Sequence, residues 1–496
     1  MNSRNLTDPR ADGAPDQTEK TDQDRRTLIA AVVGLVAGAR FQATQPSRVT
    51  TGETRGATSE VVQNWLGNVK SQVEGILRPR TVTDLQELIA QEKGRLLVMG
   101  RRMSKTALLA ARKGRALDMS ALEGILEVAG DYVVAQGGIT VFALSRALYQ
   151  RGRQLPGFTI TANPSIGGMI TAPTKGSNHP FTPFANSVSS AVQWVKVVRP
   201  SGELALLRAG EHDRELALLK DSYSAVGVVA EARLRTIPLV SAEVHEEVLP
   251  MRLFLEDGRE RARGLENRTF LFPKLGCALV RVHRDVRPAT PTAPFESLLT
   301  GPNTPYVRLV NQLPRFGRTT LLSAAVRLGA DTQPQRKLHI QNLTLYPLDG
   351  SGYLDFITWS FPIGRFEAVL PRIVEFCRSH PAFPAECLVE IFRMFPEVRF
   401  LDSDERVALD PVAFDRRESP RWEAFYRDYN RFMVDLGASP FLNQTRYIDP
   451  GDLRRVYGAR YDAWREAILA VDPDRKLGSV YLDHVLGFHE ANGARP

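Results

Sequence analysis

The stretch Pro164-Ser-Ile-Gly-Gly-Met-Ile-Thr-Ala-Pro-Thr-Lys-Gly-Ser177 decides how the first half of this chain is interpreted. It holds a glycine pair and, near its end, a third glycine. Backbone amides without side chains beside them can approach a flat, phosphorylated ligand closely and donate to its oxygens. A glycine pair by itself is more often a tight turn between strands. The meaning of the stretch therefore depends on the segments around it.

Two other segments of similar character flank that stretch. Upstream, the apolar run Arg95-Leu-Leu-Val-Met-Gly100 leads into Arg101-Arg-Met-Ser104, and downstream lies Asp221-Ser-Tyr-Ser-Ala-Val-Gly-Val-Val229. Three such backbone-rich turns in one domain indicate a dinucleotide. No G-x-G-x-x-G sequence follows a strand and opens a helix, so the Rossmann fingerprint is absent. The dinucleotide is therefore not expected to bind as in a typical NAD enzyme.

Composition excludes several other classes of protein. A chain of 496 residues, 43% hydrophobic and 24% charged, suits two or three soluble globular domains. The net charge of +8 comes from dispersed Lys and Arg, without the basic blocks and aromatic pairs of a nucleic-acid groove. Cys277, Cys377 and Cys387 have no CxxC spacing and cannot all pair. We therefore expect no nucleic-acid partner, no disulfide framework and no metal site.

The N-terminus resembles a disordered leader followed by an export signal. Residues 1–24 are polar and lack apolar periodicity, so they are predicted to be disordered. Within residues 25–45, Arg25-Arg26 precedes an apolar run too short for an ordinary membrane span, and Ala37-Gly-Ala39 is a candidate cleavage site. This pattern predicts twin-arginine export to the periplasm or beyond. The alternative is a plain helix on a cytoplasmic protein. No later segment has the length and apolarity of a transmembrane helix.

The pattern of residues 62–240 predicts an α+β domain whose sheet is not doubly wound. A first helix should have Thr83 or Asp84 near its N-cap, and a second should run over 140–151 from a Thr cap to a glycine. Short strands are predicted at 96–99, 117–120, 124–128, 132–136 and 228–236, with a hairpin of 192–199 and 203–207.

The pattern changes after Pro238. Longer strands are predicted at 338–346, 353–361 and 387–395, and helices at 362–376 and 419–436. Residues 241–448 therefore read as a domain of antiparallel sheet and helices that covers the dinucleotide, and residues 449–496 as a largely helical C-terminal segment. The fold class is α+β throughout.

Several motifs agree in order and separation with one known family. The chain resembles the vanillyl-alcohol-oxidase-type, or PCMH-type, FAD-binding domain, and its spacing is most similar to that of the sugar-1,4-lactone and alditol oxidases. The resemblance implies a two-subdomain FAD domain over 62–240, a substrate (cap) domain over 241–448, and a return of 449–496 to the FAD domain. The motifs are Trp65-x-Gly67-Asn68, Leu77-Arg-Pro79, Val98-x-Gly100, Leu117-Asp-Met-Ser-x-Leu122, Ser165-Ile-Gly-Gly168 and Gly227-Val-Val229.

The resemblance also implies which residues hold FAD. Each of them could equally belong to an ordinary turn. They are Gly100, Arg101, Arg102, Met103 and Ser104 at the pyrophosphate, Ser165, Gly167, Gly168, Thr171, Thr174 and Gly176 along the flavin and ribityl chain, and Val228 at the adenine end.

Covalent family members bond their flavin to the histidine of a Gly-x-Gly-His-Ser loop. Here that position is Met103, which cannot form the bond, so noncovalent FAD is expected unless another residue attaches it. The run Gly176-Ser-Asn-His179 also resembles the decaprenylphosphoryl-ribose oxidases, which hold FAD without a covalent link. Gly167 stands where the family has a small residue beside the flavin, and this favours oxygen as the electron acceptor.

Four residues are candidates for catalysis by this resemblance. Glu390 matches the family's active-site glutamate and could take the substrate proton, or it could form a salt bridge at a strand edge. Arg393 lies near the expected arginine. Lys175 replaces the histidine of a Gly-Thr-His-Gly motif, where a cation near the flavin would favour its anionic reduced form, although a solvated loop lysine fits equally. Gln444 falls where the family's His-Trp-Gly-Lys segment supplies a lysine, which puts polyol and lactone oxidation in doubt.

The sequence thus predicts an FAD-dependent oxidoreductase. Its reaction would move a hydride from the CH-OH group of a sugar-like or other small alcohol or lactone to FAD, and then electrons to oxygen or another acceptor. One alternative is a flavin oxidase, dehydrogenase or reductase of specialised metabolism with a bulkier apolar substrate. Another is an FAD-binding protein that has lost catalysis. The oligomeric state is left open.

Overall fold

A computed structural model describes residues 59–488 apart from 112–113, 158–159, 177–186, 257–268, 300–317, 330–334, 339, 341–342, 347–353 and 415–418. The predictions for residues 1–24 and 25–45, and most of the Gly176–His179 run, lie outside the described residues. No helix in the described part of the chain is both long and apolar enough to cross a membrane.

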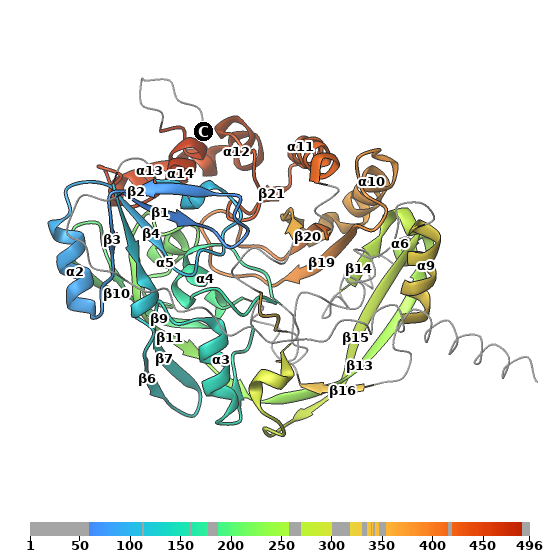
Figure 1. The fold of residues 1–496 in the computed structure, drawn as a ribbon, viewed down its shortest axis with the longest axis horizontal. Helices are drawn as coiled ribbons and strands as arrows, with labels where there is room; N and C mark the ends of the chain where they lie inside the picture. The colour runs from blue at the N-terminus through green and yellow to red at the C-terminus, as the bar shows by residue number, and fades with distance from the viewer. Residues whose placement is uncertain are drawn as a thin grey trace, which may run out of the picture.

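The first domain is built on two separate sheets (Figure 1). One is a small parallel sheet of order β3-β5-β4, formed by Ile76–Leu77, Arg115–Asp118 and Leu96–Met99. The other is antiparallel, of order β10-β9-β11-β7-β6, formed by Leu204–Arg208, Val192–Val198, Val228–Arg235, Tyr132–Gln136 and Ile125–Val128. The β9-β10 hairpin and the predicted strands are confirmed, except that the strand predicted at 117–120 lies at Arg115–Asp118 and is followed by a 3-10 helix over Met119–Ala121.

The caps of the first two helices follow from polar side chains. Helix α2 (Val82–Gln91) starts at Thr81, whose hydroxyl accepts from the Asp84 amide while the Asp84 carboxylate accepts from the Thr81 amide. Thr83 and Asp84 thus lie near the N-cap as predicted, but the cap itself is Thr81, and Asp84 closes the capping box from inside the helix. Helix α3 (Val141–Tyr149) begins after the Thr140 cap, as predicted.

The Pro164–Ser177 stretch contains a short helix, α4 (Ile166–Thr171), where turns were predicted. The Gly167 amide donates to the Gly137 carbonyl over 2.7 Å, and a Cβ at residue 167 would lie 3.0 Å from that same oxygen. Glycine is needed there because the helix packs directly against backbone at the end of β7. A Cβ at this position would also meet Val229, so the structure gives no support to an oxygen path opened by this glycine.

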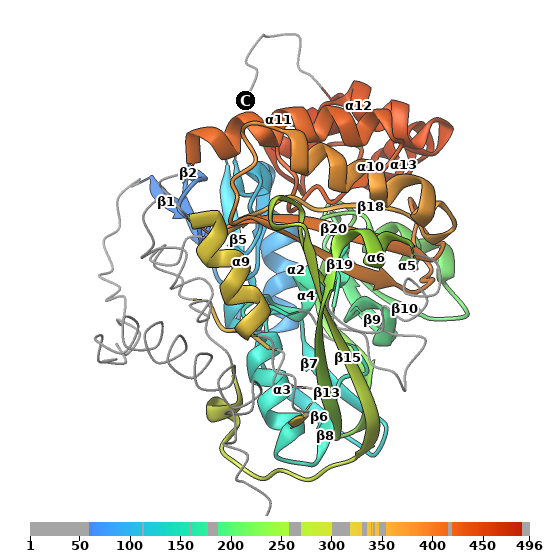
Figure 2. The ribbon, with the colours of Figure 1, turned by 90° about the vertical axis from the view of Figure 1, so that its right-hand side faces the viewer.

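The second domain is one large antiparallel sheet of order β16-β13-β15-β14-β19-β20-β18-β21, with β17 also pairing with β20. Helices α10 (Phe366–Ser379) and α11 (Ser419–Asp435) lie on one side of its strands β18 to β20 (Figure 2). The strands are β13 (Val240–Pro250), β14 (Thr269–Phe272), β15 (Cys277–Pro288), β16 (Gln335–Leu338), β17 (Asp355–Phe356), β18 (Trp359–Pro362), β19 (Leu388–Met394), β20 (Arg406–Ala413) and β21 (Ser439–Pro440).

Two predicted strands of this domain are corrected. The strand at 338–346 is displaced, because β16 ends at Leu338 and Thr344 makes only an isolated bridge to Thr161. The strand at 353–361 is interrupted between β17 and β18, and this break places Thr358 beside a polar cluster described below. The prediction of β19 is confirmed.

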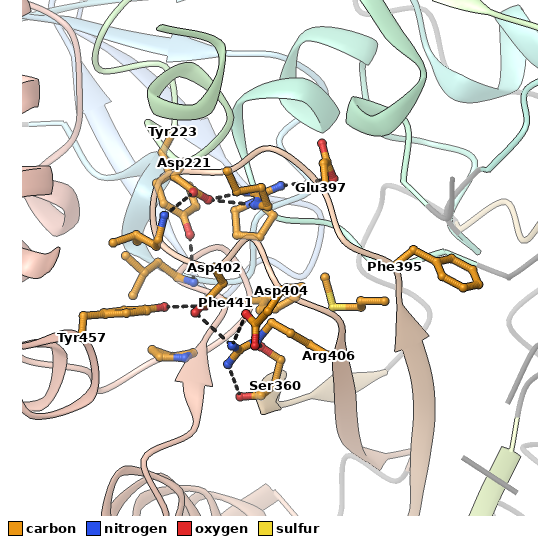
Figure 3. Close-up of a pocket in the computed structure, with 16 residues that line it drawn as sticks. Asp221, Tyr223, Ser360, Phe395, Glu397, Asp402, Asp404, Arg406, Phe441 and Tyr457 are labelled. Carbon is orange, nitrogen blue, oxygen red and sulfur yellow. Dashed lines mark hydrogen bonds and ion pairs between the residues drawn. The ribbon is translucent and has the colours of Figure 1, made fainter. Parts of the chain in front are cut away.

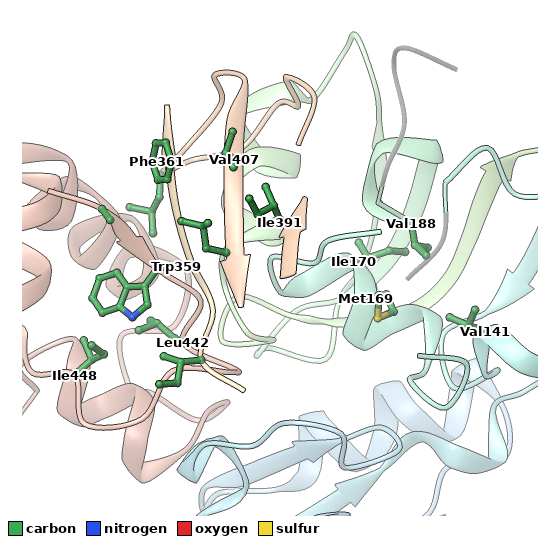
Figure 4. Packing of buried hydrophobic residues seen from close by; sticks show 14 of the residues in the cluster. Val141, Met169, Ile170, Val188, Trp359, Phe361, Ile391, Val407, Leu442 and Ile448 are labelled. Atoms are coloured by element: carbon green, nitrogen blue, oxygen red, sulfur yellow. The ribbon is translucent and has the colours of Figure 1, made fainter. Parts of the chain in front are cut away.

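The C-terminal helices α12 (Pro450–Tyr457), α13 (Ala459–Val471) and α14 (Val480–Val485) lead the chain back to the first domain. The Leu96 amide donates to the Lys476 carbonyl over 2.7 Å, and Arg95 pairs with Asp483 at 2.6 Å. Buried residues of both domains, such as Met169 and Ile391, belong to one hydrophobic cluster (Figure 4). The two domains thus share a core.

Candidate functional site

The candidate site lies where the end of the glycine-containing stretch meets the large sheet. Lys175 is 8% exposed, and its ammonium group donates to Thr358 Oγ1 and Gln444 Oε1, both at 2.7 Å. It also pairs with Asp410 Oδ2 at 2.5 Å. All three N–H groups of the ammonium therefore have partners, and the interpretation of Lys175 as a solvated loop lysine is wrong.

Two carboxylates of the sheet lie side by side next to this lysine. Glu390 on β19 and Asp410 on β20 are directly paired in the register, so their side chains share the face that Lys175 contacts. Strand β19 runs between β14 and β20, which means that Glu390 is not at a sheet edge. Asp410 is buried, whereas Glu390 is half-buried. Glu390 is therefore the more accessible of the two.

Burial shifts the pKa values of Lys175 and Asp410 in the directions that favour the neutral form of each group. Desolvation raises the pKa of Asp410, and the Glu390 charge acts in the same direction, while Lys175 opposes both. Desolvation also lowers the pKa of Lys175, against the attraction of Asp410. The arrangement can therefore hold and release a proton more easily than the same groups in water.

The orientation of Gln444 is fixed by this cluster. Its Oε1 accepts from Lys175 and lies 2.5 Å from Thr358 Oγ1, which in turn lies 2.7 Å from Asp410 Oδ1. The threonine hydroxyl has one proton, so it donates to one of these two oxygens at a time. Among the described residues, the Gln444 Nε2 group has no hydrogen-bond partner. The amide is therefore held so that it presents a donor away from the lysine.

Aromatic rings surround the charged groups. The Lys175 ammonium lies 4.8 Å from the ring centroid of Phe356, 5.5 Å from that of Phe392 and 5.9 Å from that of Phe441. Such rings attract a cation and exclude water, and electrostatic interactions are stronger where water is excluded.

Arg393 is not part of this cluster. It lies three residues after Glu390 in the same strand, and side chains at odd spacing in a strand point to opposite faces. Its Nε is 2.5 Å from Glu405 Oε1. The prediction that Arg393 acts beside Glu390 is thus corrected.

The segments predicted to hold FAD do meet. A Cβ at Gly100 would lie 2.1 Å from Ser165 Oγ, so glycine allows the 100–104 segment to reach the start of α4. A Cβ at Gly168 would lie 3.3 Å from the same hydroxyl oxygen. Thr171 Oγ1 lies 3.2 Å from Ser224 Oγ, which joins the end of α4 to the 221–229 segment.

The remaining predicted residues differ in how available they are to a ligand. Arg102 is exposed and has φ 56°, and Arg101 pairs with Glu123 at 2.5 Å. Met103 is half-buried, and Gly176 is the last described residue before the gap that begins at 177. The Ser104 hydroxyl donates to the Asn443 carbonyl over 3.2 Å, and Val228 is buried in an apolar cluster.

Unsatisfied polar atoms and strained backbone suit a polar ligand between these segments. Thr174 Oγ1 and Asn443 Oδ1 are buried and have no hydrogen-bond partner among the described residues. They adjoin Lys175 and Gln444 in sequence, and these two are bonded to each other. Tyr223 and Ser224 have left-handed backbone, with φ 51° and 70°, like Arg102. The segments present therefore fit a cofactor that supplies hydrogen bonds.

A small cavity beside the site has a different character (Figure 3). It has about 30 Å³ of free space, roughly one water molecule. Its acidic and basic side chains are paired with each other, as in Asp221 with Arg399 and Asp402 with Arg406. The cavity is too small for an organic substrate. Its ion pairs, such as Asp221 with Arg399, instead join the first domain to the second.

Comparison with known proteins agrees with this geometry. Residues 73–208 match the family model described as an FAD binding domain. The chain is thus an FAD-dependent oxidoreductase that binds FAD through a PCMH-type domain. The structure superposes on a solvent-stable cholesterol oxidase with a TM-score of 0.63 and 17% identity, covering 86% of this chain and 97% of that one, which shows a shared fold.

Within that class, the sequence is similar to enzymes named for sugar lactones. It is 24% identical over 447 residues to the L-gulono-1,4-lactone dehydrogenase of Mycobacterium tuberculosis, covering 86% of this chain and all of the relative. It is 27% identical over 212 residues to the D-arabinono-1,4-lactone oxidase of Eremothecium gossypii, covering 40% of this chain and 38% of that protein.

Sequence reasoning missed several members of the cluster. Asp410 is a single acid in the otherwise apolar run Val407-Ala-Leu-Asp-Pro-Val412, and that isolation was a usable signal. Thr358 and Asp355 carry no such signal, because their role depends on a break between strands. Lys105 follows the predicted pyrophosphate segment and is completely buried, which its sequence context does not indicate.

Proposed function

We propose that this chain oxidises the CH-OH group of a sugar-like or other small alcohol or lactone. The observation that carries the proposal is the pair Glu390 and Asp410 beside the buried Lys175, between the FAD-binding segments and the cap sheet. FAD, when bound, supplies the hydride acceptor and later passes electrons to oxygen or another acceptor.

Glu390 is the residue we assign to proton removal. It is half-buried, so a substrate hydroxyl can reach it, while Asp410 is committed to Lys175 and Thr358. Glu390 can thus take a proton as the hydride leaves. The Gln444 amide would donate to a substrate oxygen and orient it.

FAD is proposed to be held without a covalent bond. Met103 stands at the position where covalent relatives carry histidine, and its thioether cannot form that link. The unsatisfied Thr174 Oγ1 and Asn443 Oδ1, with the hydroxyls of Ser104 and Ser165, would supply hydrogen bonds to the cofactor.

A bulkier apolar substrate remains the second candidate. Phe392, Phe441, Ala408, Ile160 and Met394 form one apolar cluster next to the charged groups. Such a wall suits an alcohol attached to a hydrophobic body. The buried ionic cluster argues against a protein that has lost catalysis, since buried charges are costly to keep.

The test is anaerobic flavin reduction by a panel of sugars, lactones, simple alcohols and apolar alcohols. We expect Glu390→Gln to slow reduction by about 10²-fold or more while FAD content stays unchanged. The matched control is Glu375→Gln, an exposed carboxylate of α10, which should behave as the wild type.

Each outcome has a defined meaning. Undiminished reduction in Glu390→Gln would remove that residue from the mechanism. A wild-type flavin that no panel member reduces would refute the proposed reaction. Acid precipitation should leave FAD in the supernatant, and a yellow pellet would contradict noncovalent binding.

A further inference from the structure

A second buried lysine lies next to the candidate site. Lys105 is 1% exposed and directly follows the predicted pyrophosphate segment. Its ammonium group donates to Asp355 Oδ1 over 2.8 Å and to the Phe356 carbonyl oxygen. It also lies over the Phe356 ring, 3.3 Å from the centroid. The lysine therefore holds both the backbone and the ring of residue 356.

The same short segment, residues 355–358, contacts both lysines. Lys175 lies over the Phe356 ring as well, and Thr358, two residues further on, contacts Lys175 and Asp410. A displacement of residues 355–358 would therefore change the partners of Lys175. The position of this segment decides whether the proton-handling cluster is assembled.

Hydrogen bonds join this segment to the other two parts of the site. The Lys105 amide donates to the Asn443 carbonyl over 2.9 Å, and the Thr106 hydroxyl donates to the Leu442 carbonyl over 2.7 Å. The Thr445 hydroxyl donates to the Thr358 carbonyl over 2.6 Å. Residues 104–106, 355–358 and 441–446 thus hold one another, and Lys105 is the charged link among them.

The charges facing Lys105 come from several elements. Asp355 accepts from Arg446 Nη2 and from Trp422 Nε1 in addition to the lysine, at 2.8 and 2.9 Å. Asp410 attracts the Lys105 charge, Arg446 repels it, and Lys175 lies near the same aromatic ring. Asp355 keeps a cationic partner when Lys105 loses its proton, but the contact of Lys105 with Phe356 weakens.

We propose that Lys105 is a positioning residue of the active site, which fixes Phe356 and Thr358 against the Lys175–Asp410 pair only while it is charged. Its kinetic consequence rests on the proposed alcohol oxidation, whereas its structural consequence does not. Burial lowers the pKa of Lys105 to about 8, which brings the loss of this charge into the mildly alkaline range.

The test compares wild-type holoenzyme with Lys105→Met and Lys105→Arg between pH 6.5 and 9.5. We expect the wild-type rate of anaerobic flavin reduction to fall about tenfold through an inflection near pH 8, with KM changing less than about twofold. Lys105→Met should be slow and free of the inflection. Lys105→Arg should lack the inflection but recover part of the rate, because arginine stays charged. Persistence of the inflection in Lys105→Met would overturn the proposal.

A second readout needs no substrate. The visible absorption of bound flavin should change near pH 8 in the wild type and in the control Lys196→Met, whose ammonium group pairs with Glu231 on the first domain's sheet. The change should be absent from Lys105→Met. If that variant does not fold, Lys105→Met/Asp355→Leu removes the pair together and should also lack the change. An identical transition in the variant refutes the inference even if no substrate is found, whereas failure of the substrate panel alone refutes only the proposed reaction.

Discussion

At the scale of single residues, the site is notable for charged side chains that are almost fully buried. Lys105, Lys175, Asp355 and Asp410 all lie within the shared interior. An unpaired buried charge is strongly destabilising, and a buried pair roughly balances its own desolvation. These residues therefore contribute little to net stability, and their arrangement is better explained by the chemistry that they can perform.

The pH dependence of the free energy of unfolding should reveal the shifted pKa of one of these residues, Lys105. The pKa of Lys105 in the folded protein, about 8, lies below its ordinary value of 10.5. Between these two values the unfolded chain holds a proton that the folded protein has released, so the free energy of unfolding rises with pH by up to ~3 kcal/mol. Urea unfolding from pH 7 to 10.5 should show this rise in the wild type relative to Lys105→Met. A constant difference between the two proteins would contradict the burial argument.

Part of the site could be predicted from the sequence through its resemblance to a known family. Lys175, Glu390 and Gln444 fall at positions where that family has active-site residues, and the structure brings them together. Asp410 and Thr358 were not predicted, since they meet Lys175 only through strand register and a break in a strand. Arg393 was a candidate because it lies near the position of the family's arginine, but a strand places residues of odd spacing on opposite faces, so it points away from Glu390.

At the scale of elements, the position of α4 depends on glycine at the end of β7. A Cβ at Gly137 would lie 2.0 Å from the Val229 carbonyl oxygen, and the Gly137 carbonyl accepts from the Gly167 amide. Backbone cannot move aside as a flexible side chain can. Glycine at residue 137 therefore allows the end of β7 to lie against β11, and glycine at residue 167 allows α4 to lie against the Gly137 carbonyl.

Gly137→Ala should push the end of β7 away from Val229 of β11 and so displace the Gly137 carbonyl that accepts from α4. We expect a loss of about 2–3 kcal/mol in the free energy of unfolding, as for overpacking, together with weaker FAD binding. Urea unfolding and titration of the apoprotein with FAD measure the two effects. Gly130→Ala is the matched control, since a Cβ there would meet nothing within 4 Å. Equal behaviour of the two variants would show that the close packing is not a constraint.

Elements of the first domain were more predictable than those of the second. Helix α3 carries both its Thr140 cap and its terminal glycine in the sequence, and the β9-β10 hairpin has a Pro-Ser-Gly turn. The long strands β13 and β15 were not predicted, because charged residues such as Glu247 and Arg284 occupy their exposed portions and obscure the apolar alternation. Their pairing is a long-range property that local pattern does not contain.

At the scale of the whole molecule, one carboxylate ties together the three parts of the chain. Asp221 follows α5 (Asp213–Lys220) in the first domain, and its Oδ2 accepts from the backbone amides of Phe400 and Leu401 in the second domain, at 2.9 and 3.0 Å. Its Oδ1 accepts from Arg399. Its backbone carbonyl accepts from Trp464 Nε1 on the C-terminal helix α13, at 3.1 Å. The domains are thus held in a fixed relation at the side of the active site.

Asp221→Asn should weaken the whole assembly. The change removes the nearer of the two buried carboxylates around Arg399 and leaves only Glu397, 3.9 Å away, to balance a charge that is about 5% exposed. Breaking a buried pair in this way costs about 3–5 kcal/mol. Urea unfolding followed by tryptophan fluorescence should show that loss, and flavin release should occur at lower urea than in the wild type, since the cap and the FAD domain share this contact. The control is Asp435→Asn, which removes a 2.8 Å pair between the end of α11 and the exposed Arg455 and should cost at most about 1 kcal/mol. If Asp221→Asn behaved like that control, the junction would be incidental, and the relation of the domains would have to depend on the apolar core alone.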